Sequence, residues 1–475
     1  MLAFIPFAVL ILLLVCCISV FGNATLDGAS QVSLIIASGV SVLVGLCGRR
    51  LSWDNLDKEM TAKVASCTPS IIILLLIGAI SGTWMVSGIV PTMIYYGLQV
   101  LSPQWFLVST CVICALVSLL IGSSWTTIAT VGVALLGIGK AMGFSDGWIA
   151  GAIISGAYFG DKLSPLSDTT VLASSVVGTP LFTHIKYMMQ TTVPTFTITL
   201  LVFFVTGLLM DVSGGGDVQM FSEGLQRTFV ISPWLLLVPL VTGVMIARRW
   251  PSLVVLFLAA LVAGVVAVVA QPDRLREISG SAGSMSGMLV LYEGVFRSCY
   301  DSTAISTGVA SLDNLVATRG MAGMMPTIWL IISAQVFAGA LTASGQLSDI
   351  MGYFKRIVRG TTSLVASSVG SAVFLNITTA DQFLSIILTS SMFKDLYAKM
   401  GYEPRLLSRS CEDGGTVTSV LIPWNTCGLT QSTVLGVATL TYLPYCFFNL
   451  LSPVVSIIVA AIGWKIKRRT ASVEA

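Results

Sequence analysis

The chain has 475 residues, of which 55% are hydrophobic and only 10% are charged, and its mean hydropathy is +0.91. Soluble globular domains carry about 25% charged residues, so this composition excludes a soluble enzyme or binding module. A formal net charge of +3 is too small to indicate nucleic-acid binding. The sequence therefore predicts an integral membrane protein.

Apolar stretches of about 20 residues, long enough to cross a bilayer, recur along the first half. We expect spans over residues 2–20, 32–47, 71–90 and 192–210. Two further apolar arms, 106–121 and 126–139, meet at the polar tip 122–127 and are interpreted as a re-entrant hairpin, since protein or water can satisfy irregular backbone there. Two ordinary spans joined by a polar turn are the alternative. The segment 148–184 is interrupted at 160–170, which predicts a broken helix.

The second half repeats this plan. Spans are expected over residues 234–247, 253–270 and 327–343, with a last one before Lys465. Two arms, 363–374 and 383–393, meet at the tip 376–382, and a second broken segment covers 410–435. Each half crosses about five times, and repeats with an odd number of crossings lie upside down relative to each other. The sequence thus predicts an all-α polytopic membrane protein with two inverted repeats, residues 1–220 and 221–475.

Basic residues indicate the orientation, because Lys and Arg in short loops are retained in the cytoplasm. They follow the second span, separate two spans of the second half and end the last span: Arg49, Arg50, Lys58, Lys63, Arg248, Arg249, Lys465, Lys467, Arg468 and Arg469. Residues 90–105 carry no charge and are interpreted as an external loop. Both termini are expected in the cytoplasm.

Carboxylates are costly at membrane depth and usually mark an ion pathway. They lie at both helix breaks and at the second tip: Asp161, Asp168, Asp381, Glu412 and Asp413. Neutral oxygen donors beside them are predicted as further ligands: Ser123, Ser124, Ser167, Thr169, Asn376, Thr378, Thr379, Asn425 and Thr426. Hard cations take several oxygen ligands, and unwound backbone at helix breaks supplies more. We expect sodium at Asp161, Asp168 and Glu412, in competition with protons.

Structural roles are the alternative for some of these residues. Lys162 could pair with Asp161 and hold the first break together, and it is also a candidate charge partner for a substrate. Ser410 could begin a helix as its N-cap, with Glu412 and Asp413 at the positive helix end. His184, the only histidine, is interpreted as a solvated turn residue.

Five runs resemble the NhaC-type sodium/proton antiporters: 77–98, 122–127, 156–170, 412–418 and 422–428. The resemblance covers nearly the whole chain. It implies the ion transporter superfamily, whose members generally pair a scaffold domain with a transport domain and are commonly dimers. It also implies exchange of cytoplasmic sodium, or lithium, for external protons across a bacterial cytoplasmic membrane, without a cofactor. Val171 and Gly414 depart from the family pattern, in which Asn and Ser are expected, and each removes a candidate oxygen ligand.

A different cargo is the main alternative. Some members of the family resemble exchangers of malate, lactate or amino acids, and a small organic anion would need a cationic partner or a helix N-terminus in the cavity. Lys162 is the only obvious intramembrane candidate. An intramembrane enzyme has little support, because neither an H-E-x-x-H nor a G-x-S-x-G motif is present.

Overall fold

The structure, a computed structural model, describes residues 2–21, 28–48, 51–210, 215–248, 250–280 and 287–468. Four residues of the topology prediction, Arg49, Arg50, Arg249 and Arg469, lie outside these ranges. Within them the chain is helical, and its only extended pairings are two isolated bridges. Eight described helices are long and apolar enough to cross a membrane, or up to ten if two bent pairs each count as one span. The prediction of an all-α polytopic membrane protein is confirmed.

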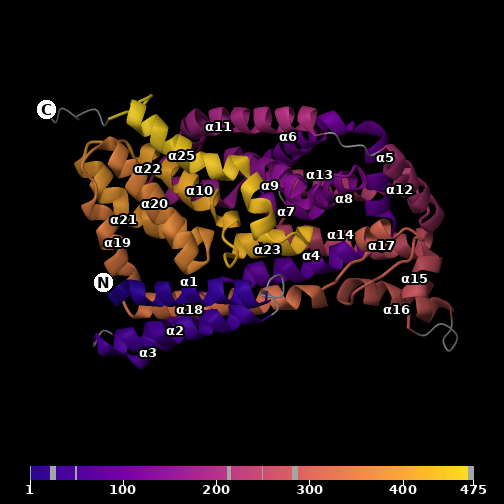
Figure 1. Ribbon diagram of the computed structural model, residues 1–475, viewed down its shortest axis with the longest axis horizontal. Coiled ribbons are helices and arrows are strands. Elements are labelled where there is room, and N and C mark those ends of the chain that lie inside the picture. The colour runs from indigo at the N-terminus through magenta and orange to yellow at the C-terminus, as the bar shows by residue number, and fades with distance from the viewer. Residues whose placement is uncertain are drawn as a thin grey trace.

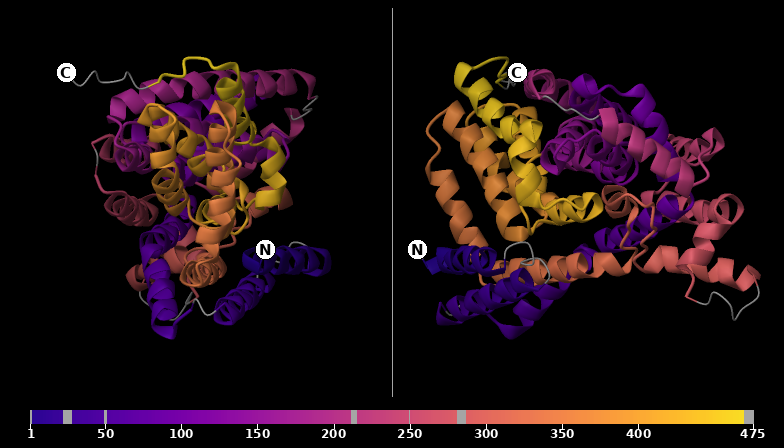
Figure 2. Two further views of the ribbon diagram at one scale, coloured as in Figure 1. Left: turned by 90° about the vertical axis from the view of Figure 1, so that its left-hand side faces the viewer. Right: turned by 45° about the vertical axis from the view of Figure 1, so that its right-hand side comes forward.

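One layer of helices contains the N-terminus and runs along the lower edge of Figure 1. It consists of α1 (Ile5–Phe21), α2 (Ala29–Cys47), α3 (Trp53–Ser66) and α18 (Met325–Ala343). Helix α18 packs against α2 and α3. Phe7 of α1 joins this layer to the rest, because its ring contacts Phe337 of α18 and Phe374 of α20. The layer stays distinct in both views of Figure 2.

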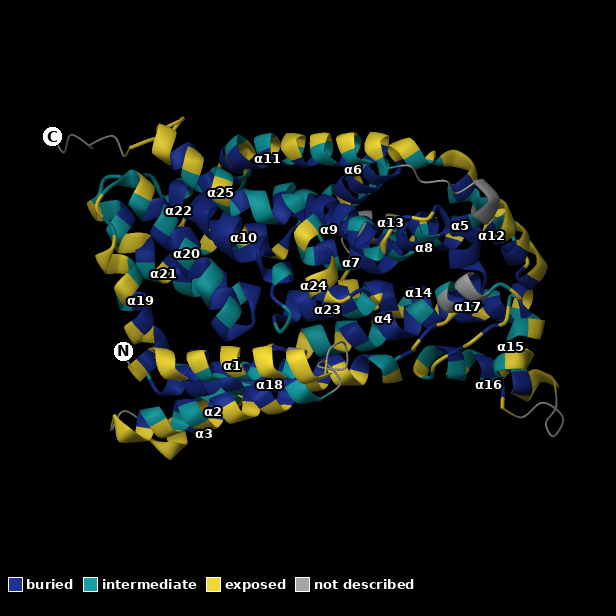
Figure 3. Cartoon of the chain, in the orientation of Figure 1, coloured by how far each residue is buried: buried dark blue, intermediate teal, exposed yellow. Residues whose placement is uncertain are grey.

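The remaining helices form a thicker body above that layer. Its first half contains α4 (Thr68–Val86), α5 (Ile89–Val100), α6 (Pro103–Ile121), α7 (Ser124–Thr127), a π-helix (Ile128–Gly132), α8 (Val133–Ala141), α9 (Asp146–Leu163), α10 (Asp168–Val177) and α11 (Leu181–Leu209). Figure 3 shows α9 largely buried, whereas α1, α3 and α11 expose many residues. Many of the exposed side chains are large and apolar, among them Leu12, Leu120 and Leu209, which suits a surface that faces lipid.

The second half contains α12 (Gly215–Thr228), α13 (Leu237–Ala247), α14 (Ser252–Ala270), α15 (Pro272–Ile278), α16 (Gly287–Tyr300), α17 (Ala310–Val316), α19 (Gln346–Arg356), α20 (Thr361–Thr379), α21 (Gln382–Lys399), α22 (Pro404–Cys411), α23 (Thr426–Leu435), α24 (Thr439–Tyr442) and α25 (Phe447–Ile462). Helices α20 and α21 pack against each other as the expected pair of arms. Both predicted helix breaks are present. The inverted relation of the two halves stays a prediction.

The expected external loop is wrong for most of its length. Residues 89–100 form α5, which packs against α8. Ile89, Val90 and Ile94 are buried on this helix. The absence of charge there reflects burial against other helices, not exposure outside the membrane.

Helices α6 and α9 approach so closely that only glycine fits at two positions. A Cβ atom added to Gly156 would lie 2.1 Å from the carbonyl oxygen of Cys111, and one added to Gly160 would lie 2.2 Å from that of Ala115. Backbone atoms cannot move aside as a flexible side chain can. The two glycines therefore set the distance between α6 and α9, and with it the position of Asp161.

Gly156→Ala is expected to lower the thermal stability of the purified protein, because overpacking a tight contact costs about 1–3 kcal/mol. The measurement is the midpoint of thermal unfolding in detergent. Gly39→Ala, on α2, is the control, because a Cβ there meets nothing within 4 Å. Equal midpoints for the two variants would show that α6 and α9 separate without cost.

Candidate functional site

The first helix break separates α9 from α10. Helix α9 ends at Leu163, and residues 164–167, which include Pro165, lead to α10. The side chain of Ser167 caps α10 by accepting a hydrogen bond from the N–H of Thr170. Asp161 thus lies in the last turn of α9, and Asp168 is the first residue of α10.

Asp161 joins this break to the first polar tip. Its Oδ2 accepts hydrogen bonds from the backbone N–H of Ser124 at 3.1 Å and from the Ser124 hydroxyl at 2.7 Å. Ser123 precedes this serine and caps the short helix α7, since its Oγ accepts from the N–H of Thr126 at 3.2 Å. The first polar tip and the first helix break are thus in direct hydrogen-bonded contact.

A cavity of about 480 Å³ opens at this junction. Four predicted ligands, Ser123, Asp161, Asp168 and Thr169, line it together with the start of α4, the start of α21 and residues 250–252. Asp161 is nearly buried in its wall, whereas Asp168 is exposed. None of the described lining residues is Lys or Arg. The junction therefore presents two carboxylates and several hydroxyls without a basic side chain on its described surface.

The second broken helix starts earlier than the Ser410 cap would require. Helix α22 begins at Pro404, and Ser410 lies inside it, where its hydroxyl donates to the carbonyl of Leu406 at 2.8 Å. The helix then continues as a π-helix over Glu412–Thr416 and a 3₁₀ turn over Ser419–Leu421. The N-cap interpretation of Ser410 is wrong, because the two acidic residues stand within a continuous helical path. Single π-helical turns are frequent at functional sites.

Lys162 pairs with Asp413, and the alternative pair with Asp161 is wrong. Both side chains are fully buried, and the Lys162 ammonium donates directly to Asp413 Oδ1. Successive residues on an α-helix point about 100° apart, so Asp161 and Lys162 face different neighbours. The hydroxyls of Thr191, on α11, and Ser452, on α25, also donate to Asp413, each at 3.2 Å. The pair thus connects the two broken helices.

Two more charged groups are buried beside this pair. Neither carboxylate oxygen of Glu412 accepts a hydrogen bond of normal geometry among the described residues; Thr416, on the same helical turn, and Lys162 and Asp161 interact with it at longer range. Arg409 is also fully buried, and none of its three nitrogens donates a hydrogen bond there. Its Nε lies 3.9 Å from Asp413 Oδ2, and its guanidinium lies 5.0 Å from the ring of Tyr187. We call Lys162, Arg409, Glu412 and Asp413 the buried charge cluster.

The second polar tip bonds to the second break, and its last residue, Gln382, also lines the cavity. Asp381 caps α21 by accepting from the N–H of Leu384 at 2.8 Å. The Asn376 amide donates to the carbonyl of Gly415 and to the hydroxyl of Thr418, while the Asn425 amide donates to the carbonyl of Asn376. The hydroxyls of Thr378 and Thr379 donate within their own helix to the carbonyl of Leu375, whereas the backbone N–H of Thr426 donates to the carbonyl of Ala380 in the tip. Their role as ion ligands stays a prediction.

His184 does not lie in a solvated turn. It is fully buried in the second turn of α11, and its Nδ1 lies 2.8 Å from the hydroxyl of Ser408. The polar run around it continues the helix that begins at Leu181, so this face of α11 packs against α22.

The model of the Na+/H+ antiporter family matches residues 156–464, which include both broken helices and the buried charge cluster. The chain belongs to this family. The predicted resemblance is thereby confirmed, and the family consists of transporters rather than enzymes.

Curated relatives of this antiporter match over nearly their whole lengths. The Na(+)/H(+) antiporter NhaC of Alkalihalophilus pseudofirmus is 36% identical, over 87% of this chain and 86% of the relative. The malate-2H(+)/Na(+)-lactate antiporter of Bacillus subtilis is 33% identical, over 94% and 93%. The arginine/ornithine antiporter ArcD of Halobacterium salinarum is 32% identical, over 92% and 87%. The cargoes named for these relatives thus differ although their sequence identities are similar.

The two departures from the family pattern have different surroundings in this antiporter. A Cβ on Gly414 would lie 2.8 Å from the carbonyl oxygen of Val369, so the glycine lets α20 pack against the π-helix. Val171 on α10 is 40% exposed and is not among the residues that line the cavity. Neither position adds a described group to the cavity wall.

Sequence reasoning missed Arg409. The signal was present, because Arg409 stands four residues before Asp413, the spacing at which oppositely charged side chains meet on a helix. Thr191 and Ser452 carried no comparable signal, since serine and threonine occur throughout the apolar helices.

Proposed function

We propose that this chain is a sodium/proton antiporter that binds its cation at Asp161 and Asp168. It transports the cation by alternating access and needs no resident cofactor. The cavity at the first break carries this proposal, because it combines two carboxylates with the hydroxyls of Ser123 and Thr169. Oxygen ligands of this kind suit hard cations. The same carboxylates can take up protons in competition with sodium or lithium. Glu412, the third predicted sodium ligand, is not among the residues that line the cavity.

The charge of the cavity favours a cation over a small organic anion. Lys162 is unavailable to an anion, because its ammonium is buried against Asp413 and Ser452. Helices α10 and α21 begin at the cavity, and helix N-termini attract anions. However, Asp168 stands in the first turn of α10 and Asp381 caps α21. Each positive helix end is thus already matched by a carboxylate.

An exchanger of malate, lactate or amino acids is the second candidate. It is favoured by the names of two relatives, the malate-2H(+)/Na(+)-lactate antiporter and the arginine/ornithine antiporter ArcD. If this alternative holds, the anionic substrate needs a basic partner in the cavity. Lys162 or Arg409 would supply it only in a conformation in which its side chain reaches the cavity.

We place the protein in a bacterial cytoplasmic membrane with both termini in the cytoplasm, on the charge pattern of its loops. The division into inverted halves, 1–220 and 221–475, and a homodimeric state stay predictions.

Proteoliposomes that contain the purified protein and an internal pH dye test the cargo directly. We expect addition of sodium or lithium to dissipate an imposed pH gradient, and malate, lactate or arginine as potassium or chloride salts to leave it unchanged. A response to an organic substrate without any response to sodium or lithium would favour the second candidate and refute the first.

A further inference from the structure

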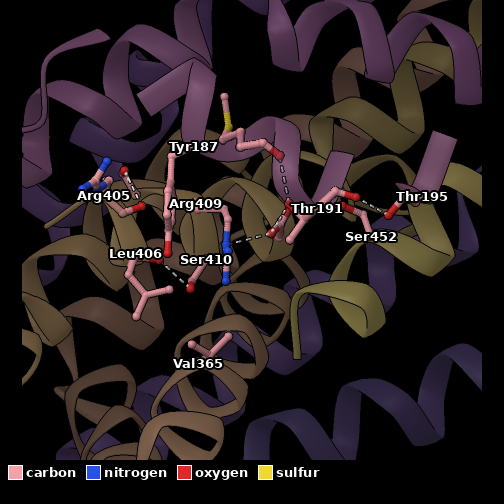
Figure 4. Close-up of polar contacts among 12 residues, drawn as sticks. Tyr187, Thr191, Thr195, Val365, Arg405, Leu406, Arg409, Ser410 and Ser452 are labelled. Atoms are coloured by element: carbon pink, nitrogen blue, oxygen red, sulfur yellow. Dashed lines mark hydrogen bonds and ion pairs between the residues drawn. The ribbon is translucent and has the colours of Figure 1, made fainter. Parts of the chain in front are cut away.

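Arg409 is an unusual buried cation, because its charge is not satisfied by hydrogen bonds. Its side chain is fully buried, yet none of its nitrogens has a hydrogen-bond acceptor among the described residues. In Figure 4 the guanidinium lies alongside Tyr187 and points toward Thr191 and Ser452. Its ion pair with Asp413 is long, 3.9 Å from its Nε, and a buried charge without hydrogen bonds is costly, so a stable protein is expected to use this group more fully in some arrangement of the cluster.

The buried charge cluster offers each member a second partner. Asp413 is bound by Lys162 and lies 3.9 Å from the Nε of Arg409. Glu412 has two oxygens without hydrogen bonds and lies within electrostatic range of Lys162. In the observed arrangement Asp413 therefore serves both cations, Lys162 through a hydrogen bond and Arg409 through a longer ion pair, while Glu412 has no cation in hydrogen-bonding contact.

A single exchange of partners would satisfy all four groups. If the ammonium of Lys162 moved from Asp413 to the neighbouring Glu412, Arg409 could donate to the vacated carboxylate. The side chain of lysine is a flexible stem with a compact charge, whereas the guanidinium of arginine is suited to hold a carboxylate in a fixed geometry. The exchange itself requires only a mobile cation at position 162 and a positive charge at position 409.

We propose that Arg409 is a positioning residue for transport: it is the alternate counterion of Asp413 and lets Lys162 pass to Glu412 during the cycle. The proposal rests on the proposed cation site, because Lys162 follows Asp161 on α9 and Asp161 acts electrostatically on Glu412. A cation bound at Asp161 offsets that carboxylate's charge and so changes the electrostatic balance between Glu412 and Asp413 as partners of Lys162.

The charged groups around Glu412 are consistent with this exchange. Asp161, Lys162 and Asp413 act on it electrostatically, and Arg409 belongs to the same helical path. Asp168 begins α10, which packs against the π-helix. Helices α20 and α25, which also pack there, contain no Asp, Glu, Lys or Arg, and α21 places Asp381 at its start and Lys394, Asp395 and Lys399 toward its far end.

The test compares Arg409→Gln, Arg409→Lys and Arg405→Gln in proteoliposomes, with the maximal rate and the sodium KM of proton exchange measured for each. Arg405 is a matched control, because it lies on the same helix, 5.2 Å from the ring of Tyr187, but pairs with Glu403. We expect Arg409→Gln to lower the maximal rate at least about tenfold while the sodium KM changes less than about threefold, the signature of a lost step after binding. Arg409→Lys should restore at least about half of the rate, and Arg405→Gln should stay within about twofold of the unchanged protein.

Wild-type rates for Arg409→Gln, or a changed KM with an unchanged maximal rate, would overturn the proposal. If Arg409→Gln does not fold, Arg409→Lys decides, and a folded but inactive lysine variant would also overturn it, because the positive charge is retained. Absence of sodium-dependent exchange in the wild-type protein would instead refute the proposed function, so the two failures are distinguishable.

Discussion

Asp161→Asn is expected to abolish sodium-dependent proton exchange. The substitution keeps the size of the side chain and an oxygen that can accept from Ser124, but it removes the negative charge that faces the cavity. Two unit charges 4 Å apart interact with about 4 kcal/mol at an effective dielectric constant of 20, and 1.4 kcal/mol is a tenfold change in affinity. We therefore expect a loss of at least about a hundredfold in sodium-dependent rate at a fixed sodium concentration.

Asp146→Asn is the matched control for this experiment. Asp146 begins the same helix, α9, but its partner is Lys140 at 3.2 Å, and both side chains are partly exposed. Exposed ion pairs contribute about 0–1 kcal/mol, so exchange by this variant should be close to that of the wild type. Full exchange by folded Asp161→Asn would refute the assignment of the cation site to the first break.

Both broken helices were predictable from sequence, because the residues that interrupt them are chemically distinct. Pro165 and Pro423 cannot continue the backbone hydrogen bonds of a helix, and carboxylates are rare in apolar segments. The contact between the first tip and the first break has the same chemical origin. Ser124 and Asp161 were the polar groups that needed partners at membrane depth, and they bond to each other.

The pairing of Lys162 was not predictable from hydropathy. Helix α9 is buried on nearly all faces, so no polar stripe in the sequence indicates which direction each side chain takes. Because Asp161 and Lys162 are adjacent in sequence, a pair between them was expected. On the helix their side chains point in different directions, and Asp161 bonds to Ser124 while Lys162 bonds to Asp413. His184 was misinterpreted for a related reason, because a polar run within a long helix resembles a turn when the contacts of that helix are unknown.

Asp413→Asn is expected to destabilise the protein strongly, whatever its effect on transport. It removes the carboxylate that accepts from Lys162, Thr191 and Ser452 and leaves two buried cations near a single acid. Breaking a buried ion pair on one side costs about 3–5 kcal/mol. The measurement is the thermal unfolding midpoint in detergent. Asp395→Asn is the control, because Asp395 is exposed on α21 and exposed substitutions usually change stability by less than about 0.5 kcal/mol.

Lys162→Met separates the alternate-counterion model from a simple ion pair. If Asp413 depended on Lys162 alone, removing the lysine would cost as much as removing the carboxylate, since either change leaves one buried charge without its partner. Arg409, 3.9 Å from Asp413, can instead take over the carboxylate when Lys162 is absent. We therefore expect Lys162→Met to lower the unfolding midpoint by about half as much as Asp413→Asn or less. Adding Arg409→Gln to Lys162→Met should remove that protection and leave Asp413 with no cation, whereas an unchanged midpoint in this double variant would show that Arg409 does not act as its counterion.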